Sequence, residues 1–203
     1  DAFLAVGLVD FGGEGGADEI PALAENLPIV FLDRRPANAE KFIWVANDDI
    51  EATRTATQFL IDKGCKNILF KALNANKIPV DEKYILKREG KAASHVEAEK
   101  IVTDFLRKNL PVDGIIASSD RSAFGALKAF RAVGLYVPED VKLISFDDTL
   151  YAERATPSLT SLDRQPKKLA RTACELLLKK ISGESVPVVN YISVELKMRD
   201  STR

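Results

Sequence analysis

One stretch of the chain, residues 114–148, decides its fold class: GIIASSDRSAFGALKAFRAVGLYVPEDVKLISFDD. Its first four residues and residues 141–146 are apolar and rich in β-branched side chains, which predicts two strands. Between them, residues 122–133 carry apolar side chains at spacings of three and four, as a helix that covers a sheet does. A helix between two strands is the βαβ unit of a parallel sheet.

The same alternation of strand and helix patterns runs through the rest of the chain. Pro166 stands where a helix can begin, and Gly64, Gly134 and Gly183 stand just past the ends of helical patterns. The sequence therefore predicts an α/β protein with parallel sheets. The further predicted strands are residues 2–9, 29–32, 42–45 and 67–70, and the further predicted helices are residues 49–63, 95–109 and 167–182.

Composition narrows the class of protein. The 203 residues are 46% hydrophobic and 29% charged, as in ordinary soluble globular proteins. With 29 basic against 30 acidic residues, the net charge of -1 offers no general attraction to DNA phosphates or anionic membranes. No apolar run approaches the roughly 20 residues that span a bilayer, and the first residues lack a signal-peptide pattern. We therefore expect soluble material, and the interpretation of the two cysteines as reduced indicates a cytoplasmic location.

Metal and cofactor chemistry has little support in the sequence. Cys65 and Cys174 show no CxxC spacing and His95 is the single histidine, so we expect no metal site and no cofactor. Both cysteines are interpreted as reduced, the alternative being one long-range disulfide in a secreted protein. The glycine-rich residues 12–16 fit neither a G-x-G-x-x-G motif nor a Walker motif, and no nucleophile motif accompanies His95.

The stretch that decides the fold class also resembles the LacI/GalR family of transcription regulators. The resemblance continues through Thr156-PSLT-Ser161, which is similar to the P-P-L-T-T element of that family. Upstream, residues 27–34 (LPIVFLDR) resemble its I-P-V-V-x-x-D-R strand, and residues 45–49 (VANDD) resemble its V-x-x-D-N segment. Three positions depart from the family: Ser119 replaces a frequent Asn, Ser145 a common Gly and Asp49 an Asn.

The resemblance implies a periplasmic-binding-protein-like type I fold, with two similar Rossmann-like lobes and a ligand cleft between them. Residues 1–65 with 163–187 would form the N-terminal lobe, and residues 66–162 with 188–203 the C-terminal lobe. The chain would cross between the lobes near residues 65–67, 162–164 and 187.

The resemblance also implies that this chain is an incomplete view of a longer one. The first residues resemble the third strand of the N-terminal lobe, so two strands and two helices would precede them, and the DNA-binding headpiece would be absent from this chain. Residues would also be missing between Phe70 and Lys71, because too little chain follows that strand for a crossover helix.

The implied function is the effector-sensing core of a DNA-binding transcription regulator, most simply a repressor. A small sugar-like effector would bind in the cleft of a homodimer and change operator affinity allosterically, without catalysis. Two other classes stay open. A periplasmic sugar-binding protein of a transport system shares the fold and would carry a signal peptide, and a nucleotide-using α/β enzyme would need a phosphate-binding loop.

Candidate effector-binding residues follow the predicted strands, because loops at the carboxyl ends of parallel strands line ligand sites. Asp147 follows residues 141–146, where a carboxylate can bind two sugar hydroxyls or cap a helix. Ser119 and Asp120 follow residues 114–117 and open a helix, and one of the two is expected to cap it. Arg121 either faces the crevice or is solvated.

In the first lobe, three further residues are candidates for effector contact. Asp48 and Asp49 lie between a predicted strand and a predicted helix, where acids commonly cap the helix. The resemblance implies one binding-site acid near this turn. Trp44 ends a predicted strand, so its ring could stack on a sugar, although a half-buried core tryptophan is an equal alternative.

Overall fold

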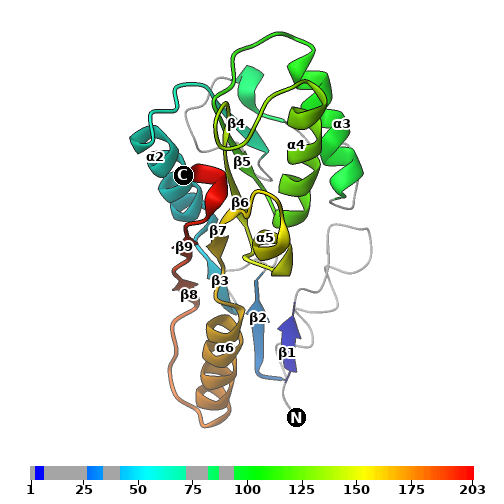
Figure 1. The fold of residues 1–203 in the computed structure, drawn as a ribbon. Helices are drawn as coiled ribbons and strands as arrows, with labels where there is room; N and C mark the ends of the chain where they lie inside the picture. Colours follow the sequence, from blue (N-terminus) through cyan, green and yellow to red (C-terminus); the bar gives the residue numbers. More distant parts are fainter. Residues whose placement is uncertain (1–2, 7–26, 34–41, 72–81, 87–93) are drawn as a thin grey trace. The chain divides into compact units, whose positions relative to one another are not determined.

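The computed structural model describes residues 3–6, 27–33, 42–71, 82–86 and 94–203 (Figure 1). The chain divides into two compact units, each built around its own sheet. The first unit comprises Asp1–Asp48 and Gln165–Ser193, and the second comprises Asp49–Arg164 and Val194–Arg203.

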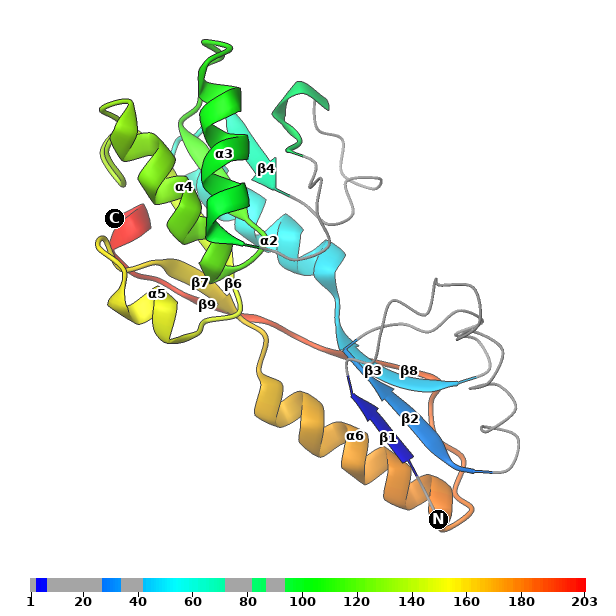
Figure 2. The same ribbon diagram turned by 90° about the vertical axis from the view of Figure 1, so that its right-hand side faces the viewer.

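The first unit has a parallel sheet with strand order β1-β2-β3-β8. Its strands are β1 (Phe3–Val6), β2 (Ile29–Leu32), β3 (Ile43–Asn47) and β8 (Val189–Ile192). Helix α6 (Pro166–Ile181) lies along one face of this sheet (Figure 2). Burial of apolar side chains from both elements drives this packing: Val30, Val45 and Ile192 from the sheet, and Leu169, Ala173 and Leu176 from α6.

Among the described residues, the second unit has a five-stranded sheet with order β4-β5-β6-β7-β9, in which β4 to β7 are parallel and β9 is antiparallel to β7. Its strands are β4 (Ile68–Lys71), β5 (Gly114–Ala117), β6 (Lys142–Phe146), β7 (Thr160–Asp163) and β9 (Glu195–Lys197). Its helical elements are α2 (Asp49–Asp62), α3 (His95–Leu106), α4 (Asp120–Ala132), α5 (Leu150–Arg154) and the short 3-10 segments η3 (Glu82–Tyr84) and η4 (Asp200–Thr202).

Helices cover both faces of the second sheet, as Figure 1 shows. Successive strand residues point to opposite faces, so Leu69, Ile115 and Leu143 pack against α3 and α4. The residues that follow them, Phe70, Ile116 and Ile144, pack against α2. Continuous apolar runs such as residues 143–146 are therefore strands buried on both faces.

The predicted α/β class with parallel sheets is confirmed, and most predicted elements begin and end within a few residues of the observed ones. Pro166 occupies the start of α6, and Gly64, Gly134 and Gly183 adopt positive φ just after helices. The short elements β7, β8 and α5 were not predicted from periodicity. Strand β9 ends at Lys197, and residues 200–202 form η4.

The division into units differs from the expected lobes at two of the three crossings. Helix α2 belongs to the second unit, because Ala52, Ala56 and Leu60 contribute to its core. Strand β8 belongs to the first unit, because it pairs with β3 and aligns Trp44 with Val189. The chain therefore passes from one unit to the other at residues 48–49, 164–165 and 193–194.

The expected break after Phe70 falls inside a strand, since β4 continues through Lys71. Residues 72–81, which follow β4, lie outside the described residues, as do residues 7–26 with the glycine-rich segment. Ile85 pairs with Phe70 in an isolated parallel bridge, and α3 is the helix that connects β4 to β5.

Candidate functional site

Polar residues follow three neighbouring strands at the carboxyl edge of the second sheet. Strands β5, β6 and β7 are parallel neighbours, so their carboxyl ends lie at one edge. Ser119 follows β5, Asp147 follows β6 directly and Arg164 follows β7 directly. This edge is where open parallel sheets place their ligands.

Arg164 brings two of the predicted acids together. One guanidinium nitrogen, Nη2, donates a hydrogen bond of 3.1 Å to Oδ1 of Asp49, and the other, Nη1, lies 4.0 Å from Oδ1 of Asp147. The Arg164 side chain is 25% exposed, against 68% for Asp49 and 35% for Asp147. The sequence analysis missed Arg164, although its place directly after the P-P-L-T-T-like strand was a signal.

The two aspartates after β6 occupy an unusual turn. Asp147 has a φ of 100° and Asp148 a φ of 51°, and residues other than glycine seldom adopt a positive φ. The Asp147 amide donates to the Leu162 carbonyl at 3.0 Å, and the Asp148 amide donates to the Ser161 hydroxyl at 3.1 Å. These bonds to β7 hold the turn in place.

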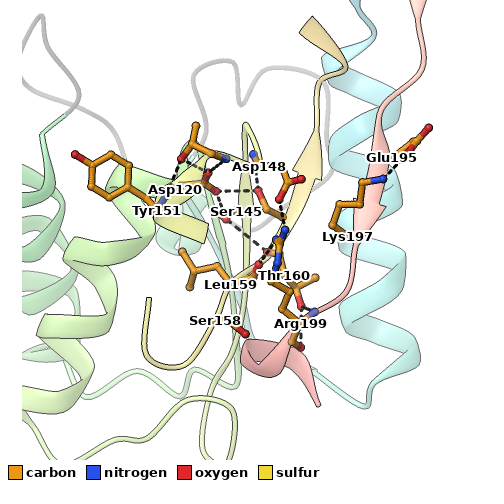
Figure 3. Close-up of polar contacts among 12 residues, drawn as sticks. Asp120, Ser145, Asp148, Tyr151, Ser158, Leu159, Thr160, Glu195, Lys197 and Arg199 are labelled. Carbon is orange, nitrogen blue, oxygen red and sulfur yellow. Dashed lines mark hydrogen bonds and ion pairs between the residues drawn. The ribbon is translucent and has the colours of Figure 1, made fainter. Parts of the chain in front are cut away.

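Asp148 is committed to a structural ion pair. Its Oδ1 lies 2.6 Å from Nη2 of Arg199, and the two side chains are only 14% and 18% exposed (Figure 3). Nη1 of Arg199 also donates to the Leu159 carbonyl at 2.8 Å. The two aspartates therefore differ: Asp148 anchors the turn through its ion pair, whereas the carboxylate of Asp147 is more exposed.

Asp120 was expected to contact an effector, but its carboxylate is buried and occupied. The residue is 1% exposed. Its Oδ1 accepts hydrogen bonds from the hydroxyls of Ser145 at 2.6 Å and Ser161 at 2.8 Å, and its Oδ2 accepts from the amide and hydroxyl of Thr149 at 2.6 and 2.8 Å (Figure 3). Four donors fill a carboxylate's capacity, so we assign Asp120 a structural role.

Ser119 is the residue that caps α4, which agrees with the expectation that Ser119 or Asp120 does so. Its hydroxyl accepts a hydrogen bond from the Ser122 amide at 3.2 Å, and the Ser122 hydroxyl accepts one from the Ser119 amide at 3.0 Å. This reciprocal capping box fixes the Ser119 side chain at the carboxyl edge. Arg121, in the first turn of α4, is exposed.

In the first unit, the residues after β3 are the candidates. Asn47 is 4% exposed and donates to the Ile192 carbonyl at 2.9 Å, while Asp48 is half-buried. Trp44 was expected at the end of its strand, but it is the second residue of β3. It is 4% exposed and its ring meets Tyr191 edge-on at 5.3 Å, so it lies in the core, three residues before the end of the strand.

Within the described part of the chain, no three His, Cys, Asp or Glu residues are grouped to hold a metal ion. Likewise, no described helix is both long and apolar enough to cross a membrane. Cys65 is buried and donates from Sγ to the Asp113 carbonyl at 3.2 Å, whereas Cys174 is exposed. His95 meets the ring of Phe124 edge-on.

Residues 63–202 match the family model described as periplasmic binding protein-like domain. The chain belongs to this family. The fold described above agrees, because the structure of the transcriptional regulator CelR in complex with cellobiose superposes with a TM-score of 0.82 at 26% identity, covering 99% of this chain and 65% of that one. A LacI family regulator from Arthrobacter sp. FB24, solved in complex with lactose, gives a TM-score of 0.76 at 25% identity, covering 93% and 75%.

The curated relatives that this chain matches are named as transcription regulators and repressors. The ribose operon repressor of Halalkalibacterium halodurans is 29% identical over 191 residues, which cover 88% of this chain and 57% of the repressor. The chain thus spans about three fifths of the length of the first curated relatives it matches. The named relatives are transcription regulators rather than enzymes.

Proposed function

We propose that the chain is the effector-sensing core of a LacI/GalR-type DNA-binding transcription regulator, acting as a repressor. It binds a small sugar-like effector and thereby changes the affinity of the whole protein for its operator. The names of the relatives support this proposal, since they include a ribose operon repressor and regulators solved with cellobiose and with lactose.

The placement of Asp147 carries the proposal. Its backbone is fixed by the bond to Leu162, its carboxylate is 35% exposed, and Arg164 stands 4.0 Å away. A carboxylate held in this way can accept hydrogen bonds from two neighbouring hydroxyls of one sugar, and such charge-assisted bonds are stronger than neutral ones. Ser119, at the same edge, supplies a hydroxyl for a further bond. Arg121 and Asp48 stay secondary candidates for effector contact.

The partners follow from the same proposal. Operator DNA would be bound as a palindromic site by a homodimer of the whole protein in the cytoplasm. The sheet units themselves would carry no catalysis. An effector can shift operator affinity only by the difference between its affinities for the two states of the protein.

An operator-binding assay with the full-length protein tests this function. An operator is first selected from random DNA, and its dissociation constant is then measured by fluorescence anisotropy with and without saturating cellobiose, lactose or ribose. We expect one sugar to change operator affinity by about 5- to 150-fold, the usual size of an allosteric coupling. Failure to select any DNA would contradict the regulator function, and an operator affinity that no sugar changes would contradict the effector class.

A further inference from the structure

The chain passes between the two units three times. At one of these passages, the side chains of two consecutive residues, Arg164 and Gln165, each bind a residue at one of the other two passages. The passages lie at residues 48–49, 164–165 and 193–194. Arg164 is the last residue of the second unit before its passage, and Gln165 is the first residue of the first unit after it.

Within the second unit, Arg164 binds Asp49, the residue at which the chain first enters that unit. Its Nη2 donates to Oδ1 of Asp49 at 3.1 Å, 115 positions away in the sequence. Asp49 is also the first residue of α2, whose Ala52, Ala56 and Leu60 are buried in the core of that unit. The bond therefore fixes the passage at Arg164 to a rigid helix.

Within the first unit, Gln165 binds Ser193, the last residue before the chain leaves that unit. Its Nε2 donates to the Ser193 carbonyl at 2.6 Å, and the nearby Asn47 donates to the Ile192 carbonyl at 2.9 Å. Gln165 adopts a left-handed conformation with φ 53° and ψ 55° and makes no side-chain cap to α6. A non-glycine residue is held in this region only where other contacts impose it, and the bond to Ser193 is such a contact.

We propose that Arg164 and Gln165 form a hinge clamp, which confines bending between the units to the three passages. This inference rests on the proposed function and names the residues that make its allosteric response possible. Each bond stays inside one unit, so neither needs to break when the units change their arrangement. Arg164 also lies 4.0 Å from Asp147, which links an effector bound there to the clamp.

The test uses two substitutions, one that removes a clamp bond and one that weakens the other, and neither changes Asp147. Gln165→Ala removes the bond to Ser193, and Asp49→Asn removes the charge that Arg164 binds. Arg54→Gln and Gln58→Ala are matched controls, because Arg54 pairs with Glu51 and Gln58 donates to Asp62 entirely within α2. All variants are made in the full-length protein.

Two measurements separate this inference from the proposed function. The first is backbone hydrogen exchange without any ligand, followed in peptides that contain the three passages. The clamp predicts that Gln165→Ala and Asp49→Asn each speed exchange there severalfold, while the controls match the wild type. Unchanged exchange in both clamp variants would overturn the clamp, whether or not the protein binds a sugar.

The second measurement compares effector affinity with the effector-induced change in operator affinity. The clamp predicts that Gln165→Ala keeps the sugar dissociation constant within about threefold and loses most of the change in operator affinity. A full response in this variant would overturn the link between the clamp and regulation. A wild type that responds to no sugar would instead contradict the proposed function, and the exchange data would still decide on the clamp.

Discussion

The hydroxyl of Ser145 donates a 2.6 Å hydrogen bond to a carboxylate oxygen of Asp120, 25 positions earlier in the chain. Both residues are buried. Ser145 is also the position where the LacI/GalR pattern that the sequence resembles commonly has Gly, so this chain has a hydroxymethyl group in place of a hydrogen atom, two residues before Asp147. Ser145, one of the three positions that depart from the family pattern, is thus part of a buried polar network.

This network predicts an asymmetry between two substitutions. Asp120→Ala leaves the hydroxyls of Ser145 and Ser161 buried without this acceptor and removes the acceptor of the exposed Thr149, so we expect it to lower the free energy of unfolding by about 3 kcal/mol or more. Ser145→Ala removes one donor of four and should cost about 1–2 kcal/mol. Urea unfolding followed by circular dichroism measures both. Equal costs would contradict the central place of Asp120.

Gly125 provides a prediction about the contact between α3 and α4. A Cβ added there would lie 2.2 Å from the His95 carbonyl oxygen and 2.8 Å from Cβ of Ala98. Gly125→Ala should therefore destabilise the protein by about 1–3 kcal/mol through overpacking. The sign is informative, because in an exposed helix the same change stabilises by about 1 kcal/mol.

Gly134→Ala is the control for that change, since a Cβ there meets nothing within 4 Å. Its φ of 79° still makes Ala unfavourable, by about 1–2 kcal/mol. Urea midpoints of the two variants are compared with the wild type. A more stable Gly125→Ala variant would show that the two helices are not in close contact.

The two cysteines should differ in reactivity. Burial, followed by the charge of Asp113, raises the pKa of the Cys65 thiol above its ordinary value of 9.0, so this thiol stays protonated at neutral pH. Cys174 is exposed on α6. Titration with a thiol reagent should therefore label Cys174 in the native protein and Cys65 only after unfolding, with Cys174→Ser as the control. Rapid labelling of both would contradict the burial of Cys65.

The raised pKa also sets the sign of a pH effect. The folded state binds the Cys65 proton more tightly than the unfolded chain does, so the contribution of this thiol to stability is complete below pH 9.0 and is lost as pH rises through the folded-state pKa. Cys65→Ala should remove this part of the alkaline decline in the urea midpoint. An identical decline in the variant would contradict the assignment.

The fold was largely predictable because its main elements have strong local patterns. Continuous apolar strands and the helical spacing in residues 122–133 identify the βαβ unit without any tertiary information. The short elements were missed because pairing, and not periodicity, makes them: β8 has the exposed residues Val189 and Tyr191 and exists through its bonds to β3. Helix α2 was predicted, but it was assigned to the wrong unit, because its membership depends on the core residues that it contacts.

The sequence predicted where the candidate site residues lie, at the ends of strands, but not what each residue does there. Strand ends identified Ser119, Asp120 and Asp147, yet only tertiary contacts show that Asp120 is filled by four donors. Trp44 was placed at a strand end because the pattern ended two residues early. Arg164 was missed because its partners, Asp49 and Asp147, are distant in the sequence.

Asp147 should contribute to effector affinity without supporting the fold. We expect Asp147→Ala to weaken sugar binding by about 1.5–3 kcal/mol, the value of hydrogen bonds to a charged group, with an unchanged urea midpoint. Isothermal titration calorimetry measures the affinity. Asp104→Ala is the control, because that exposed acid on α3 pairs with Arg107, three residues later, at 3.1 Å. Unchanged affinity in Asp147→Ala would remove Asp147 from the site.

A thermal-shift screen of the full-length protein against sugars, sugar phosphates and nucleotides tests the central claim most directly. A ligand at about 100 times its dissociation constant stabilises a protein by about 2.7 kcal/mol, which such a screen detects. We predict that a neutral sugar raises the melting temperature of the wild type and of Asp104→Ala, and that Asp147→Ala loses most of this shift. A shift with nucleotides alone, or an equal sugar shift in Asp147→Ala, would contradict a sugar-sensing site at this edge of the sheet.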